Sequence, residues 1–148
     1  MNIIRLPLAH LHRLGGIERT INPNEWTSEV EEFVFGKQLT DAARSYKAAL
    51  RITAIESEGV IIAAAVSFPD PLFEATTRIA ALVVDPRHRG RGVGQTLLQA
   101  AVSEIVEEAA TACWLVHPNN VGMLRCSRRI EPRPEEATVL DYNMFVSP

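Results

Sequence analysis

The sequence predicts an α/β fold in which helices flank a mixed β-sheet. Two β-rich runs, 51–57 and 60–68, are separated by a glutamate and a glycine, which is typical of a hairpin. Five consecutive apolar residues, 79–83, indicate a third strand that is buried on both faces. From Val93 onward, apolar residues recur every three or four positions, which predicts a helix that packs on the sheet through one stripe.

The N-terminal third is less regular than the rest. Residues 3–6 predict a first strand, and residues 8–25 fit no single pattern but leave room for a short helix. Residues 27–50 predict one broken helix or two short ones, because Thr27 or Ser28 can act as an N-cap and acidic residues follow in the first turn.

The C-terminal part alternates strands and helices. A helix can begin at residue 119, where Asn119 or Asn120 is available as its N-cap. The predicted elements are a strand over 76–85, a helix over 93–109, a buried strand over 112–117, a helix over 119–129 and a last strand over 137–146.

Composition restricts the class of protein. The 148 residues are 47% hydrophobic and 22% charged with a net charge of -3, which fits a single globular domain over 1–148 and disfavours nucleic-acid binding. No apolar run is long enough to span a bilayer and no cleavable signal precedes the first strand, so we expect a cytoplasmic protein with no membrane partner. Cys113 and Cys126 fall within predicted regular structure and are expected to be free thiols.

The stretch "DPRHRGRGVGQTLLQAAV", residues 85–102, links the buried strand to the helix that follows. A helix N-terminus presents unpaired backbone N–H groups and the positive end of the helix dipole, and both attract anions. Three glycines let the backbone approach a ligand, and three arginines add charged donors, which suits a diphosphate. An ordinary surface turn with solvated arginines is the alternative.

The spacing of these glycines excludes two common phosphate motifs. A Walker loop requires a lysine that "GRGVGQT" lacks, and the dinucleotide fingerprint requires a glycine where Leu97 stands. The segment "RGRGVG", residues 89–94, resembles the acyl-CoA signature of the GNAT superfamily of N-acyltransferases, in which an arginine or glutamine is followed by two spaced glycines. The order of elements over 51–146 is similar to that fold. The resemblance implies a GNAT-like sheet that is mostly antiparallel, with a splayed strand pair at the acyl-CoA site.

The same resemblance implies an acetyl-CoA co-substrate and no metal. The backbone of 89–95 would hold the pyrophosphate, and Val83 and Val84 would pair with the pantetheine arm as an added strand. A backbone N–H near Leu82 or Val83 would polarise the thioester carbonyl. The implied cofactor-binding residues are Leu82, Val83, Val84, Arg89, Gly90, Arg91, Gly92, Val93, Gly94, Gln95 and Asn119. Arg87 and His88 either touch a ribose phosphate or are solvated.

Proton transfer is the less defined part of the site. Many family members use a glutamate on the strand before the loop, and residues 76–84 contain none. His117 at the end of the strand over 112–117 is suited to proton transfer near neutral pH, or is a half-buried histidine that ends the strand. Cys126 aligns with the family's tyrosine and is a candidate acid, or a small core residue. Tyr142 on the last strand is the third catalytic candidate.

The sequence therefore predicts an N-acyltransferase that moves an acetyl group, or another short acyl group, from acyl-CoA to a primary amine in a ternary complex. The amine belongs to a small molecule or a protein, and a homodimer is possible. The alternatives are a CoA-binding regulatory module without catalysis, and a tRNA-directed or nucleic-acid-directed protein that uses the arginines near 87–91 and 125–133.

Overall fold

The computed structural model describes residues 1–7, 10, 13, 49–70, 73–138 and 142–148. Within them, seven strands form one sheet in the order β1-β2-β3-β4-β5-β7-β6. The strands are β1 (Asn2–Arg5), β2 (Arg51–Ser57), β3 (Val60–Pro69), β4 (Thr76–Val84), β5 (Thr111–Val116), β6 (Glu135–Thr138) and β7 (Tyr142–Val146). The helical elements are a 3-10 helix, η2 (Pro86–His88), and the helices α4 (Val93–Glu107) and α5 (Val121–Arg128).

All neighbouring strands pair antiparallel except β4 and β5, which are parallel. The mixed, mostly antiparallel sheet that the sequence predicts is therefore confirmed. The turn between β2 and β3 lies at Glu58-Gly59, where both residues have positive φ, as the hairpin prediction requires. The helices expected over 27–50 lie outside the described residues.

The prediction of one last strand over 137–146 is wrong. Two strands, β6 and β7, pair antiparallel, and Thr138 lies opposite Tyr142, so the chain reverses direction between them. No glycine or proline marks this reversal in the sequence, and that is why the apolar run looks continuous. Smaller differences occur at other ends: β1 begins at Asn2, β5 ends before His117, and α5 begins at Val121.

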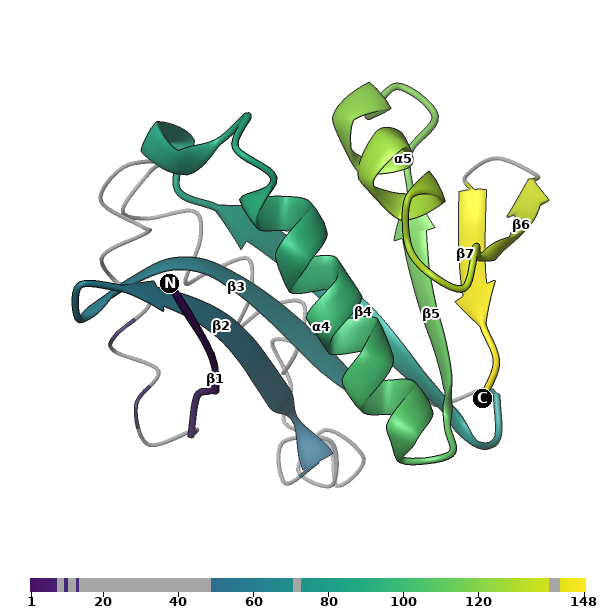
Figure 1. The fold of residues 1–148 in the computed structure, drawn as a ribbon. Helices are drawn as coiled ribbons and strands as arrows, with labels where there is room; N and C mark the ends of the chain where they lie inside the picture. The colour runs from purple at the N-terminus through teal and green to yellow at the C-terminus, as the bar shows by residue number, and fades with distance from the viewer. Residues whose placement is uncertain (8–9, 11–12, 14–48, 71–72, 139–141) are drawn as a thin grey trace, which may run out of the picture.

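The core lies on both faces of the sheet. The larger cluster lies between the sheet and α4, and it includes Leu97, Leu98 and Ile105 from the helix and Trp114 from β5. Figure 1 shows α4 crossing this face of the sheet diagonally. A second cluster on the opposite face contains Leu6, Ile52, Ala54, Ile61, Ala64 and Val66. The apolar stripe predicted from Val93 onward is thus the face that α4 buries.

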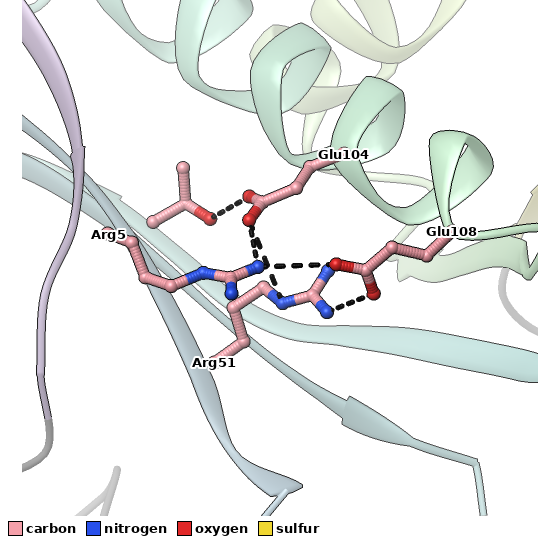
Figure 2. Close-up of polar contacts among 5 residues, drawn as sticks. Arg5, Arg51, Glu104 and Glu108 are labelled. Atoms are coloured by element: carbon pink, nitrogen blue, oxygen red, sulfur yellow. Dashed lines mark hydrogen bonds and ion pairs between the residues drawn. The ribbon is translucent and has the colours of Figure 1, made fainter.

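The C-terminal half of α4 is joined to β1 and β2 by an ion-pair network, shown in Figure 2. Arg5 of β1 and Arg51 of β2 reach toward Glu104 and Glu108 of the helix, and both arginines contact both glutamates. The buried Thr53 also donates its hydroxyl to Glu104, at 3.3 Å. The network fastens the edge strand β1 to the helix, and the Arg51 hydrogen bond lowers the pKa of Glu108.

Because its folded-state pKa is lowered, Glu108 stabilises the fold above the pH at which glutamates titrate, and that stabilisation is lost as pH falls. We expect Glu108→Gln to reduce the free energy of unfolding by about 0.5 to 1 kcal/mol at pH 7, since the half-exposed pair is screened by solvent. The difference from the unmodified protein should be smaller at about pH 3, because the carboxylate is then partly or fully protonated. Urea unfolding at both pH values measures it.

Glu107→Gln is the matched control, because Glu107 is the exposed neighbour of Glu108 and has no ion pair among the residues the structure describes. It should change stability little at either pH. A Glu108→Gln penalty that is the same at both pH values would show that the network does not act through the carboxylate charge.

Candidate acyl-CoA site

The parallel pair β4–β5 opens toward one end. Pairing runs from Thr76–Thr111 to Ile79–Trp114 and then stops, although β4 continues to Val84. Figure 1 shows the two strands side by side at their beginnings and apart at their ends. On its other edge β4 stays paired with β3, with Ala80 as an extra residue between the pairs Ser67–Ile79 and Val66–Ala81. Such a bulge bends a strand, and the splayed strand pair expected from the sequence is present.

The free edge of β4 exposes specific backbone groups. Asp85 donates its N–H to the carbonyl of Ile62 in β3, at 2.8 Å. Because successive residues of a strand point their backbone groups to opposite edges, Val83 also faces β3, and Leu82 and Val84 face the opening. Arg89 donates to the Val84 carbonyl at 3.3 Å, as this orientation requires. Of the two amides considered from the sequence, Leu82 is therefore the one directed into the splay.

Asp85 organises the loop that follows β4. Its carboxylate is 2% exposed, caps η2 by accepting the Arg87 N–H at 3.0 Å, and pairs with the Arg87 guanidinium at 2.9 Å. These hydrogen bonds hold the pKa of Asp85 below its usual range. Arg87 is thus one half of an ion pair. His88 also faces Asp85, with Nδ1 3.7 Å from the carboxylate.

The N-terminus of α4 has no side-chain cap. Its N-cap residue is Gly92, with φ of 77°, and no side chain among the described residues bonds the first turn. The first helical hydrogen bond is Thr96 N–H to the Gly92 carbonyl, at 3.0 Å. The amides of Val93, Gly94 and Gln95 precede that bond and donate to no acceptor in the described part of the chain. Three donors at the positive end of a helix dipole remain available for an anion.

At Gly94 the first turn of the helix faces side chains at the end of β4. A Cβ added there would lie 3.4 Å from Val84 Cγ2 and 3.9 Å from Leu82 Cδ2. The uncapped amides and the free edge of β4 therefore belong to one surface.

A groove of about 490 Å³ connects these features, bounded by the end of β4, the loop, the first turn of α4, and α5. Cations from two sides line it, Arg89 from the loop and Arg125 and Arg129 from α5, and no described lining residue is acidic. We call it the β4–α5 groove. Its lining residues are Leu82, Val83, Val84, His88, Arg89, Gly90, Gly92, Val93, Gly94, Gln95, Asn120, Gly122, Met123, Arg125, Cys126 and Arg129.

The groove brings together all the predicted cofactor residues except Arg91 and Asn119. Arg91 is exposed at the loop. Asn120 rather than Asn119 lines the groove, and its side chain caps α5 by accepting the Met123 N–H at 3.2 Å. The choice between two adjacent asparagines depends on the path of the chain out of β5, which the sequence does not show.

The three catalytic candidates are in different places. Cys126 is half-buried and lines the groove. His117 is exposed just beyond β5, and its Nδ1 accepts the Asn119 N–H at 3.1 Å, so that in the neutral ring the proton is on Nε2. Tyr142 begins β7, and its side chain lies outside what the structure describes. Of the two thiols, Cys113 is buried within β5, and burial raises its pKa.

The sequence interpretation placed Cys126 in the site but did not assign the rest of the groove-facing side of α5 to the acyl-CoA site. Gly122, Met123, Arg125 and Arg129 line the groove together with Cys126. The sequence could have predicted this, because spacings of three and four residues put these side chains on the same side of a helix as Cys126. The buried Trp114 of β5 donates its indole N–H to Ser127 at 2.8 Å, which fixes this side of α5 toward the groove.

A mostly antiparallel sheet with one splayed parallel pair, beside a helix with an uncapped N-terminus, is the architecture of the GNAT N-acetyltransferases. The family model described as acetyltransferase (GNAT) family matches residues 14–130. The chain belongs to this family. No curated protein sequence matches it.

Solved structures of low sequence identity share the fold. A GNAT-family protein from Desulfovibrio desulfuricans has a TM-score of 0.74 at 13% identity, covering 99% of this chain and 98% of its own. Ribosomal-protein-alanine N-acetyltransferase from Brucella melitensis has a TM-score of 0.68 at 19% identity, with 100% of both chains covered. PaiA N-acetyltransferase from Thermoplasma acidophilum, solved in complex with coenzyme A, has a TM-score of 0.63 at 16% identity, with 100% of both covered.

Two further features of the described residues bear on the sequence predictions. None of their helices is long and apolar enough to cross a membrane. They also contain no group of three histidine, cysteine or acidic side chains placed to hold a metal ion.

Proposed function

We propose that the chain transfers an acetyl group from acetyl-CoA to a primary amine while both substrates are bound. The observation that carries the proposal is the juxtaposition of an uncapped α4 N-terminus with the free edge of β4. The amides of Val93, Gly94 and Gln95 would bind the pyrophosphate. The backbone of Leu82 and Val84 would pair with the amide groups of the pantetheine arm, as a strand edge pairs with an added strand.

In this arrangement the thioester lies in the splay beside Leu82. The amine nitrogen attacks the thioester carbon, so an N–C bond forms, the C–S bond breaks and its electron pair leaves with the CoA sulfur. Negative charge develops on the carbonyl oxygen during attack, and the Leu82 N–H is oriented to donate to it. A donor fixed in a strand needs no reorganisation as the charge develops.

Two protons have to move during the transfer. We assign the proton for the leaving thiolate to Cys126, which lines the groove and is the one catalytic candidate to do so among the described side chains. We assign the proton lost by the amine to His117, which stands at the open end of the splay outside the groove. His117 must release the Asn119 N–H to act as a base, because that bond occupies its lone pair.

The acceptor class follows from the chemistry of the family. The Brucella protein is named for the alanine of a ribosomal protein. For this chain we propose a primary amine, on a protein or on a small molecule, that reaches the splay from outside the β4–α5 groove.

The direct experiment measures thiol release from acetyl-CoA with a panel of primary amines, alongside CoA affinity by calorimetry. We expect amine-dependent release of one free thiol per acetylated product, with the product identified by mass. A second candidate, a CoA-binding module without catalysis, is favoured by the absence of any carboxylate in β4. Tight CoA binding without turnover on any amine would support the module and contradict the transferase.

Gly92 tests the cofactor groove. We expect Gly92→Val to weaken CoA binding at least about tenfold, because a side chain at φ of 77° strains the backbone by about 1 to 2 kcal/mol and displaces the first-turn amides. Isothermal titration calorimetry measures the dissociation constant.

Gly59→Val is the matched control for this variant. Gly59 has φ of 78° and, like Gly92, has no atom within 4 Å of an added Cβ, but it lies in the β2–β3 turn away from the groove. The two variants should lose similar stability, and only Gly92→Val should lose affinity. Equal CoA affinity in both would contradict the assignment of the α4 N-terminus.

Cys126 tests the proposed acid. Cys126→Ala should lower kcat at least about tenfold with little change in CoA affinity, because general acids contribute to the transition state rather than to binding. Steady-state kinetics and calorimetry separate the two quantities. Cys113→Ala, which removes a thiol away from the groove, should leave kcat within about twofold of the unmodified protein. A Cys126→Ala variant with unchanged kcat would leave Cys126 as a packing residue only.

A further inference from the structure

On the α5 side of the β4–α5 groove there is positive charge that takes no part in the proposed pyrophosphate site. Arg125 and Arg129 are four residues apart, are both exposed, and both line the groove. Within the described residues neither guanidinium has an ion pair or a hydrogen bond. Two unpaired cations therefore face a groove that has no described carboxylate in its lining, in a protein of net charge -3.

Arg128, on the same helix, shows the contrast. Its guanidinium is paired with Glu136 of β6 at 3.0 Å, and it does not line the groove. Cations near a helix C-terminus are favourable because of the helix dipole, which explains why α5 ends in arginines. The dipole does not explain why the two arginines on the groove side lack acidic partners. Like charges four residues apart on a helix repel each other, so leaving both of them unpaired is unfavourable in the absence of a bound anion.

The positions of these two arginines are fixed by contacts on either side of them. Ser127 is bonded to the buried indole of Trp114 at 2.8 Å, which anchors α5 to β5. The chain just after α5 is clamped to α4, because the side-chain amide of Gln99 bonds both the N–H and the carbonyl of Glu131, each at 2.9 Å. Arg129, two residues before this clamp, lines the same groove as the uncapped amides.

Acyl-CoA carries two separate phosphate centres, the pyrophosphate and the 3′-phosphate of its ADP moiety. In the proposed function the pyrophosphate binds the α4 side of the groove, where Arg89 also lies. We propose that Arg125 and Arg129 bind the 3′-phosphate from the α5 side and so make this protein selective for CoA over 3′-dephospho-CoA. This inference rests on the proposed function, because it requires CoA to occupy the groove.

Calorimetric titration with CoA and with 3′-dephospho-CoA at low ionic strength tests the proposal. The unmodified protein should bind CoA at least about tenfold more tightly, because charge-assisted contacts to a phosphate are strong. In the double variant Arg125→Gln/Arg129→Gln, affinity for CoA should fall until the two ligands differ by no more than about twofold. Affinity for 3′-dephospho-CoA should stay unchanged, which also shows that the variant is folded.

Arg128→Gln is the matched control, since it removes the same charge from the same helix outside the groove. It should keep the full preference for CoA. Equal weakening of both ligands in the double variant would place the arginines on the pyrophosphate, and an unchanged preference would place the 3′-phosphate elsewhere; either result overturns the proposal. An unmodified protein that binds neither ligand contradicts the proposed function itself.

Discussion

The parallel pairing of β4 and β5 ends at Ile79 and Trp114, and the geometry of the groove depends on that end. A strand that continued to pair would use the backbone of Leu82 and Val84 for sheet hydrogen bonds. The bulge at Ala80 and the hydrogen bond from Asp85 to Ile62 instead keep β4 paired with β3 and leave its other edge without a strand partner. The N-terminus of α4 lies against the end of this strand, where Gly94 faces the side chains of Leu82 and Val84. Strand edge, loop and helix start thus form one continuous polar surface.

Much of this surface was predictable because it is local in sequence. The strand, the loop and the helix are consecutive, and the positive φ values at Gly90 and Gly92 are at two of the three glycines that the pattern "RGRGVG" contains. The apolar stripe of α4 is equally local, since its period gives both the helix and the face that it buries.

The rest of the site depends on contacts between distant segments. Arg87 looks like a free cation in the sequence, yet Asp85 pairs with it once η2 forms. Arg125 and Arg128 look equivalent, and only the position of β6 decides that Arg128 meets Glu136. The split between β6 and β7 and the use of Asn120 as the α5 cap also depend on how chain segments meet in space. Spacing along the sequence does not contain that information.

The uncapped start of α4 also links ligand binding to stability. A serine, threonine or aspartate at the N-cap stabilises a helix by about 1 kcal/mol, and Gly92 has no side chain that makes this contact. An anion seated on the first-turn amides would act as the missing cap, so the ligand would complete the helix as well as occupy the groove. By mass action, the free energy of unfolding would then rise with the logarithm of the ligand concentration once that concentration exceeds Kd. The stability of α4, the helix on which the larger core packs, would therefore depend on whether the cofactor is bound.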